Sequence, residues 1–365
     1  MVFIRRAIVA QKMRIRTLKR LMSSKENSSH KIEPNNISMI KMNFLIFFTL
    51  MVSSIFVLLF KRYEWKRDTD MIVRRLLQNE KTSYNDATSK AAFHDNHAQT
   101  IQETLHSLPF AIQKYLQTVL NIIVDEDRGT SYIMHEPIRI IKSVKIEQEG
   151  SIFLNDKWVP FKASQVSSCI PSSPGFVWDS ETSMFPKIPW LNYLKIRARD
   201  SYVGGHGNLY VSIAGVLPLI KASGKEADVA EFMRWMAEMS FYPTSYLPHD
   251  GTRLHWVKDV KGMKGPWPDH HGSFARARLV DPNSDIEGEL EFLFDENNLL
   301  TTIRGYRLMT SNGKSEYLPW EGHITDYDIY DGIMVPSSAS IGYYIDGKFS
   351  PYFKGQYKNF VFDFF

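Results

Sequence analysis

Residues 288–308 read GELEFLFDENNLLTTIRGYRL, and this stretch decides the fold. In its first half, apolar side chains alternate with other residues at Leu290, Phe292 and Phe294. Four turn-forming residues follow at 295–298, and a second apolar run begins directly after them. A period of two on each side of a polar turn is typical of two antiparallel strands joined as a hairpin.

The same pattern recurs on both sides of this hairpin. Towards the C-terminus, Asp331-Gly332 and Asp346-Gly347 separate further alternating segments, and Asp-Gly supplies the positive φ that a tight hairpin needs. Towards the N-terminus, we predict strands over 141–148, 158–165, 194–200 and 209–213, with hairpin turns at Glu149-Gly150 and at Gly204–Gly207. The pattern indicates an antiparallel meander of many strands.

Two segments have helical spacing instead. Residues 105–122 form the first, with Pro109 in its opening turn, and residues 225–241 form the second. The second carries on one side the apolar residues Val229, Phe232, Met233, Met236 and Met239. We therefore predict an α+β domain over residues 101–365, in which a large curved antiparallel sheet packs on two or three helices.

An uncharged apolar segment precedes this domain. Residues 43–60 read NFLIFFTLMVSSIFVLLF, which as a helix spans roughly 27 Å, close to the thickness of a bilayer core. Lys61-Arg62 bounds it, with Tyr63 and Trp65 as predicted interfacial anchors. A buried core helix and a cleaved signal peptide are the alternatives, but no small-residue cleavage site follows. We predict a single transmembrane helix, followed by a polar juxtamembrane helix and linker over 61–100.

The charge of the chain is concentrated in the leader. Residues 1–42 carry a net charge of +8, so the rest sums to −4 although the whole chain is +4. A nucleic-acid-binding domain needs positive charge on its folded part, so nucleic acid is excluded as a partner. Residues 1–22 resemble a mitochondrial presequence, or form a basic tail against anionic lipid.

Orientation in the membrane stays open. Basic residues close to the span favour a cytosol-facing C-terminal domain, whereas counting the whole leader reverses that result. The N-x-S/T sequons, Asn27 and Asn36, both precede the span, which favours the cytosolic orientation. A single-pass protein of the mitochondrial inner membrane is the alternative localisation.

Familiar catalytic and cofactor motifs are missing. There is no nucleophile elbow, phosphate-binding glycine loop, dinucleotide fingerprint or zinc-protease helix. Cys169, the single cysteine, allows no intramolecular disulfide, and its sequence context points to no catalytic thiol. Four histidines lie at 249, 255, 270 and 271, but their spacing places no ligand set on one face of an element. We predict no catalytic residue, no metal and no cofactor.

Arg234 and Glu238 are the most suggestive pair. They lie four residues apart on the predicted helix 225–241, among aromatic and methionine side chains. On a solvent face they would form a routine ion pair, whereas in an apolar cavity they could bind a polar headgroup or act in acid–base chemistry. The candidate ligand-binding residues are Arg234, Glu238, Trp178, Trp235, Met236 and Trp256.

Several segments together resemble a domain family of unknown function. They are LPFAIQKYL (108–116), EQEGSIFLNDKWVPFKASQ (147–165), FVWD (176–179), DSYVGGHGNLYVSIAG (200–215), RWMAEMSFYPTSYLP (234–248), LPWEGHITDY (318–327) and YFKGQYKNF (352–360). The resemblance covers about residues 100–360 and implies similarity to the lipoprotein-carrier, LolA-like fold. That fold is an incomplete antiparallel barrel that wraps around helices and shelters acyl chains.

Three functional hypotheses follow. The favoured one is a module tethered to the lipid bilayer through residues 43–60 that binds an apolar or lipid-like ligand between sheet and helices. The second is an enzyme with an acid–base carboxylate, such as Glu238, at the cavity mouth. The third is a non-catalytic adaptor in a membrane complex.

Overall fold

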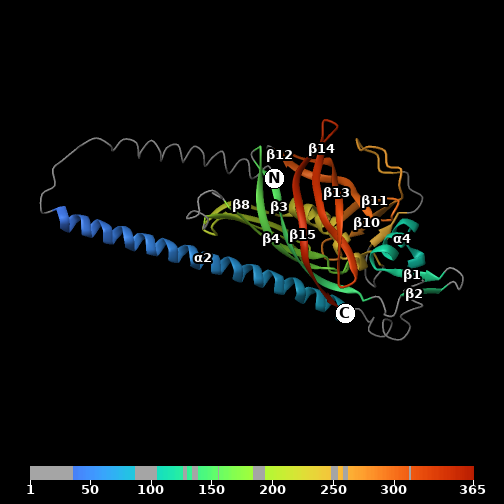
Figure 1. Ribbon diagram of the computed structural model, residues 1–365, viewed down its shortest axis with the longest axis horizontal. Coiled ribbons are helices and arrows are strands. Elements are labelled where there is room, and N and C mark those ends of the chain that lie inside the picture. Colours follow the sequence, from blue (N-terminus) through green and yellow to red (C-terminus); the bar gives the residue numbers. More distant parts are fainter. Residues whose placement is uncertain are drawn as a thin grey trace.

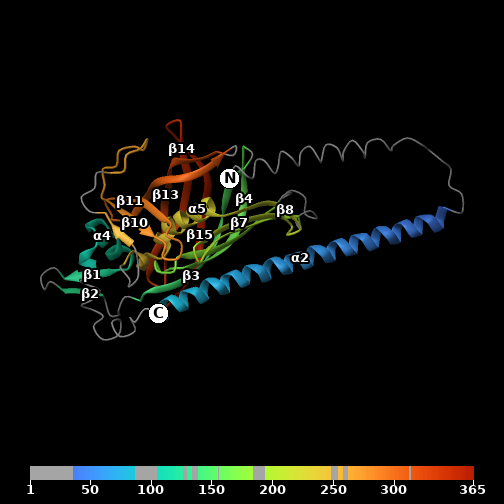
Figure 2. The same ribbon diagram turned by 180° about the vertical axis from the view of Figure 1, so that it is seen from behind.

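The computed structural model confirms the α+β class. It describes residues 36–86, 105–125, 130–133, 139–154, 156–183, 194–247, 254–257, 262–311 and 314–365. A long helix, α2 (Asn36–Asp86), lies along one side of a curled sheet (Figures 1 and 2). Most of the predicted leader 1–42 and the predicted linker between residues 87 and 100 lie outside the described residues.

The sheet is an antiparallel meander, as predicted. Its strands are β3 (Ile141–Leu154), β4 (Lys157–Ser168), β5 (Gly175–Ser183), β6 (Lys195–Val203), β7 (His206–Ile213), β8 (Leu217–Ser223), β9 (Leu254–Trp256), β10 (Phe274–Val280), β11 (Glu287–Phe294), β12 (Leu300–Ser311), β13 (Lys314–Tyr330), β14 (Ile333–Ile345) and β15 (Lys348–Phe364). Among the described residues the spatial order is β8-β7-β6-β5-β4-β3-β15-β14-β13-β12-β11-β10-β9. The first and last long strands, β3 and β15, therefore pair near the middle of the sheet. They join two halves, which we call wings: β3–β8 and β9–β15.

Four predicted turns are confirmed and one is wrong. The turn at 295–298 joins β11 to β12, and Asn298 in it has a positive φ. Asp331-Gly332, Asp346-Gly347 and Gly204-Gly205 all have positive φ at the hairpins. Glu149-Gly150 is not a turn, because β3 continues straight through it to Leu154. Gly150 pairs with Gly355 of β15, and a Cβ on Gly150 would lie 2.0 Å from the carbonyl oxygen of Lys354. This glycine allows two central strands to approach each other closely.

The helices are shorter than predicted. The helix expected over 105–122 is α4 (Phe110–Val119), because Pro109 stands at its N-cap and interrupts the preceding turn. The helix expected over 225–241 is α5 (Lys225–Ala237), which tightens into two 3₁₀ turns, η3 (Glu238–Phe241) and η4 (Pro243–Tyr246). Pro243 disfavours the α conformation at Tyr242, which has φ −142° and ψ 71°, so the helical path is interrupted between η3 and η4. The hairpin β1 (Ile122–Asp125) and β2 (Thr130–Ile133) is separate.

The core lies between the two wings, on the concave face, where α5 packs (Figure 2). Phe232, Trp235 and Met236 of α5 and Met239 of η3 are all fully buried. Burial of each such side chain contributes roughly 1.5–3 kcal/mol, so this helix is a main source of stability. The space between the two wings is thus the interior of the domain.

Helix α2 packs on the opposite, outer face. Trp65 stacks on Tyr210 and donates a hydrogen bond from Nε1 to Asp179 at 2.9 Å, and Leu76 packs with Val177. The prediction of Trp65 as an interfacial anchor is wrong, since it is only 5% exposed. Within the described residues, α2 is the one helix long and apolar enough to cross a membrane, and its apolar window is entirely unburied.

Substitution of Gly150 tests the close approach of β3 and β15. Gly150→Ala should destabilise the domain by about 2–3 kcal/mol, because the new methyl group meets backbone that cannot move aside without breaking the central strand pair. Denaturant unfolding of the detergent-solubilised chain, followed by tryptophan fluorescence, measures this.

Gly322→Ala is the matched control. A Cβ there would meet its nearest neighbour, the Trp320 ring, at an ordinary 3.5 Å. We expect a change within about 0.5 kcal/mol. Equal effects of the two substitutions would contradict the assigned role of Gly150.

Candidate functional site

A row of polar and aromatic side chains crosses the concave face beneath α5. Gln165 of β4, Trp178 of β5 and Asp200 of β6 stand directly opposite one another in register. Because alternate residues of a strand share a face, all three point towards the helix. On β6, Asp200 occupies a position in the series Ile196, Ala198 and Tyr202, whose other members are apolar or aromatic.

Arg234 of α5 connects the helix to this row. Its Nε donates to Glu238 Oε1 at 2.8 Å, its Nη1 to Asp200 Oδ2 at 2.7 Å, and its Nη2 to Gln165 Oε1 at 3.1 Å. The guanidinium also lies over the Phe176 ring, 4.5 Å from its centroid. Burial lowers the pKa of Arg234, but the carboxylates of Glu238 and Asp200 outweigh that effect and raise it. Arg234 is therefore a permanently charged centre.

The network extends across three strands. Gln165 Nε2 donates to Glu238 Oε2 at 2.6 Å, so both carboxylate oxygens of Glu238 accept hydrogen bonds. Gln148 Nε2 donates to Gln165 Oε1 at 3.0 Å, and Trp178 Nε1 donates to Gln148 Oε1 at 2.9 Å. Such a chain fixes the orientation of each amide and holds Glu238 in place.

Glu231 adds a second carboxyl group beside Asp200. The pKa of Glu231 lies well above its ordinary value, because burial disfavours its charge and the Asp200 carboxylate repels it. A hydrogen bond to Asp200 also favours the protonated form of Glu231. Glu231 Oε2 and Asp200 Oδ1 are both buried, and a proton on Glu231 gives these two acceptor oxygens a way to bond.

The second wing brings another cation to this point. Arg307 of β12 donates from Nη2 to the carbonyl oxygen of Ala230 at 2.6 Å and lies over the Trp320 ring at 4.9 Å. With Glu231 protonated, Arg234 and Arg307 balance Asp200 and Glu238. We call these five charged or titratable residues, Glu231, Arg234, Glu238, Asp200 and Arg307, the Arg234 cluster.

The Arg234 cluster is not sealed from solvent. The side chains of Arg234, Asp200 and Glu238 are 20%, 14% and 15% exposed. Pairs this far from bulk water interact more strongly than surface ion pairs. The arrangement suits recognition of a polar headgroup better than nucleophilic chemistry, since its five members supply no hydroxyl or thiol.

The predicted ligand residues separate into three groups. Arg234, Glu238 and Trp178 lie together as described. Trp235 and Met236 are also on α5 but belong to the core, where Trp235 Nε1 donates to the Ser168 carbonyl oxygen at 2.8 Å. Trp256 lies on β9 at the far edge of the sheet, packed against Tyr246 and Phe292. His249 lies outside the described residues, in which no metal-binding group of three ligands occurs.

Sequence reasoning missed Glu231, Gln148, Gln165, Asp200 and Arg307 as site residues. A signal was present for three of them. Gln148, Gln165 and Asp200 each continue an alternating apolar series with a polar residue. One such exception is common, but three on neighbouring strands indicate a polar contact on the inner face.

A model of the family described as a family of unknown function, DUF6920, matches residues 106–362 of the chain. No curated protein matches the chain.

Solved structures resemble the chain at low identity. A protein described as a putative outer-membrane lipoprotein-sorting domain from Vibrio parahaemolyticus is 10% identical, with 60% of this chain and 85% of that chain covered and a TM-score of 0.33. A DUF1329-family protein from Desulfovibrio piger is 13% identical, with 61% and 86% covered and a TM-score of 0.34. A LolA-superfamily protein from Nitrosomonas europaea is 7% identical, with 68% and 92% covered and a TM-score of 0.33.

Glu238→Gln tests the network. The amide would present an NH₂ group to one of two donors, Arg234 Nε or Gln165 Nε2, and would remove a counter-charge from Arg234. We expect the free energy of unfolding to fall by about 1–3 kcal/mol. Glu226→Gln, the same change at an exposed position of α5, should cost less than about 0.5 kcal/mol. Equal losses would remove the case for Glu238 as an organising residue.

Glu231→Gln tests the shared proton. Because the folded chain holds the Glu231 proton more tightly than the unfolded chain, this residue lowers stability progressively as the pH rises above its ordinary pKa of 4.5. A glutamine keeps a donor for Asp200 and removes that loss. The melting temperature of Glu231→Gln should therefore match the wild type near pH 4 and exceed it at pH 8. A lower melting temperature at pH 8 would mean that Glu231 is ionised in the folded chain.

Proposed function

We propose that this chain, which belongs to the family of unknown function DUF6920, is a membrane-anchored protein that binds an amphipathic, lipid-like molecule on the concave face of its sheet. The apolar part of the ligand lies along the sheet, and its polar head meets the Arg234 cluster. The observation that carries this proposal is a half-buried apolar part of the concave face that ends at the partly buried Arg234 cluster.

The concave face differs on the two sides of the Arg234 cluster. On one side, α5 and η3 cover it and its residues are fully buried. On the other side, six inward-facing apolar residues stay partly exposed although they belong to central strands. We call them the open half: Ile152, Ala163, Ala198, Ile341, Tyr343 and Phe353.

The open half has its smallest side chains next to the cluster. Ala163, Ser180 and Ala198 stand opposite one another on β4, β5 and β6, one row beyond Gln165, Trp178 and Asp200. Ala163 and Ala198 are half-buried and Ser180 is buried, and Phe353 and Tyr343 of the other wing are half-buried as well. An alkyl chain placed there would bury apolar area on both sides.

The cluster supplies what a polar head requires. Of the five N–H donors of an arginine, Arg234 uses three in the contacts described above. Arg307 Nε is buried and has no hydrogen-bond partner among the described residues. Donors beside an apolar surface favour a ligand with an oxygen-rich head and an apolar tail.

Helix α2 supports the membrane assignment. Residues 43–60 expose large apolar side chains along the helix, including Phe44, Phe47 and Phe56. A helix that is apolar all round is stable when lipid surrounds it. The turn between β7 and β8 lies beside Lys61, where the span ends, so the strand ends that border the open half face the membrane. The cytosol-facing orientation remains a prediction.

Filling the open half should remove the ligand. Ala198→Trp places an indole on the open half next to Asp200, and we expect the purified full-length chain to lose a co-purifying lipid in native mass spectrometry. Lys145→Trp is the control, because Lys145 is an exposed outward residue of β3. It should retain the lipid, and both variants should keep a cooperative melting transition.

Two outcomes would overturn the proposal. A wild-type chain that carries no lipid, from either membrane extracts or detergent, would favour the adaptor hypothesis. A lipid that survives in a well-folded Ala198→Trp variant would place the ligand elsewhere on the molecule.

A further inference from the structure

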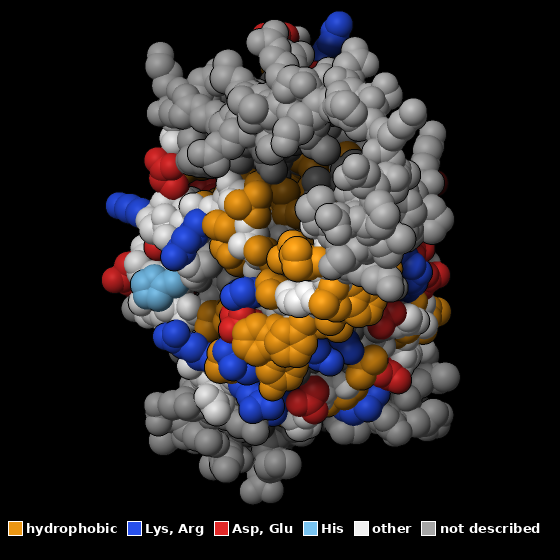
Figure 3. Space-filling model, turned by 90° about the vertical axis from the view of Figure 1, so that its left-hand side faces the viewer, with side chains coloured by type: hydrophobic (Ala, Val, Ile, Leu, Met, Phe, Trp, Pro, Cys, Tyr) orange, Lys and Arg blue, Asp and Glu red, His pale blue; other side chains and the backbone are white. Residues whose placement is uncertain are grey.

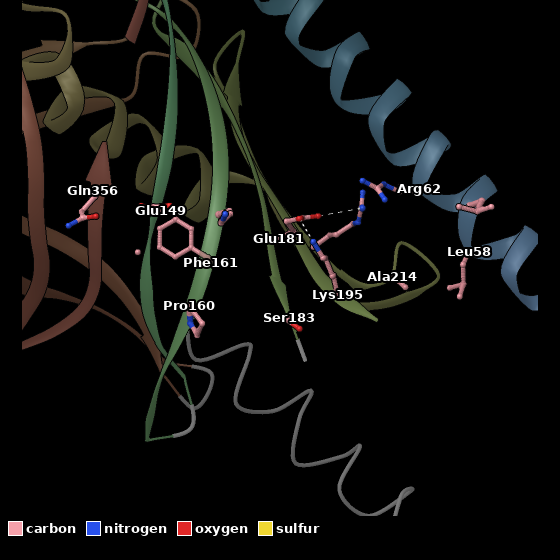
Figure 4. Close-up of a pocket in the computed structure, with 14 residues that line it drawn as sticks. Leu58, Arg62, Glu149, Pro160, Phe161, Glu181, Ser183, Lys195, Ala214 and Gln356 are labelled. Carbon is pink, nitrogen blue, oxygen red and sulfur yellow. Dashed lines mark hydrogen bonds and ion pairs between the residues drawn. The ribbon is translucent and has the colours of Figure 1, made fainter. Parts of the chain in front are cut away.

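A cavity lies on the outer face, away from the Arg234 cluster. It has a volume of about 790 Å³ and opens between α2 and the outer side of β3–β6. Leu58, Leu59 and Arg62 line it from α2, and Lys162, Lys195 and Arg197 line it from the strands (Figure 4). We call it the outer cavity. Its size falls within the range of ordinary small-molecule sites.

The outer cavity is positively charged. Its lining has four cations against two carboxylates, Glu149 and Glu181. Glu149 is already paired with Lys358 at 2.9 Å, and Glu181 is shared between Lys195 and Arg197. Within the described part of the chain, Arg62 and Lys162 form no ion pair. The surplus charge is thus available to an anion.

The position of Arg62 along α2 shows where the basic residues lie relative to the apolar segment 43–60. Leu58 and Leu59 are in the last turn of the apolar segment 43–60, and Arg62 follows one turn later. In Figure 4, Arg62 points from α2 towards the strands that carry Glu181 and Lys195. The outer cavity therefore combines apolar side chains at the depth of acyl chains with basic side chains at the depth of lipid headgroups.

The neighbouring strand ends lie at the same level. Gly215 in the β7–β8 turn approaches the backbone of Lys61, and a Cβ on it would lie 3.2 Å from the Lys61 carbonyl oxygen. The next two residues, Val216 and Leu217, are 46% and 48% exposed. Figure 3 views the molecule from the side on which α2 begins and shows hydrophobic side chains gathered near the centre of this face with Lys and Arg around them. Such a surface suits contact with a bilayer.

We propose that the outer cavity binds one anionic phospholipid of the membrane that α2 crosses, with the phosphate among Arg62, Lys162, Lys195 and Arg197 and the acyl chains against Leu58 and Leu59. The inference rests on the membrane anchoring in the proposed function, but not on the ligand of the concave face. This lipid would fix the angle of the sheet to the membrane, since it fills the space between helix and strands.

The test uses the full-length chain in nanodiscs of mixed phosphatidylcholine and phosphatidylglycerol. Native mass spectrometry after release from the disc should find phosphatidylglycerol retained on the wild type above its share of the disc. Arg62→Gln/Lys162→Gln removes the two unpaired cations, and we expect retained phosphatidylglycerol to fall about tenfold. Both side chains are exposed, so folding should be unaffected.

A matched variant separates a built site from general attraction to an anionic membrane. Lys157→Gln/Lys348→Gln removes the same charge from exposed lysines that do not line the outer cavity. It should retain phosphatidylglycerol as the wild type does. Equal losses in the two double variants would overturn the inference.

Two further arms identify the ligand and isolate this proposal from the first. Inorganic phosphate added to the discs should not displace the lipid, and displacement would mean that the cavity is a site for free anions. Ala198→Trp should keep phosphatidylglycerol, whereas Arg62→Gln/Lys162→Gln should keep any ligand of the open half. Membranes that carry the chain should retain it in alkaline carbonate. If carbonate extracted it, residues 43–60 would not span the bilayer, and this inference would fail with its premise.

Discussion

A buried guanidinium group must have its donors and its charge satisfied, and for Arg234 that requirement determines how α5 sits on the sheet. Its partners come from β4, β6 and the end of α5 itself, so the helix cannot slide or rotate without breaking an ion pair in a partly buried setting. Phe176 and Trp178 stack against the same group. Apolar packing supplies most of the stability of this interface, and the contacts of Arg234 fix the position and rotation of α5 on the sheet.

The same constraint limits the chemistry. An acid–base carboxylate must be free to exchange protons with a substrate, but both oxygens of Glu238 already accept hydrogen bonds. Glu231 is the better candidate for a carboxyl group that stays protonated, because burial and Asp200 oppose its charge. Among the titratable groups of the Arg234 cluster, Glu231 is therefore a better candidate than Glu238 for proton exchange.

Local signals predicted the fold well because hairpins are local. Residues 288–308 and the Asp-Gly turns contain both the alternation and the turn chemistry, so the meander could be derived from short windows. The meeting of β3 with β15 could not, since Gly150 and Gly355 are far apart in the sequence and a lone glycine resembles a turn residue. For the site, Arg234 and Glu238 were found from helical spacing, whereas Asp200 and Arg307 reach it only through the curl of the sheet. Trp256 was selected as a candidate ligand residue because it is aromatic, but the sequence does not show whether an aromatic side chain lies at a ligand site or packs in the core.

Strand β6 connects the two faces. Its outward residues Lys195 and Arg197 line the outer cavity, and Arg199 packs on Trp65 of α2, while its inward residues Ala198 and Asp200 face the concave side. A slip of one residue in register would exchange these two sets and place three cations in the core. The contacts of Arg199 oppose that slip, because its Nη1 donates to Thr69 Oγ1 at 3.0 Å and ties the outward side of β6 to α2. Helix α2 thus also secures the register on which both proposed sites depend.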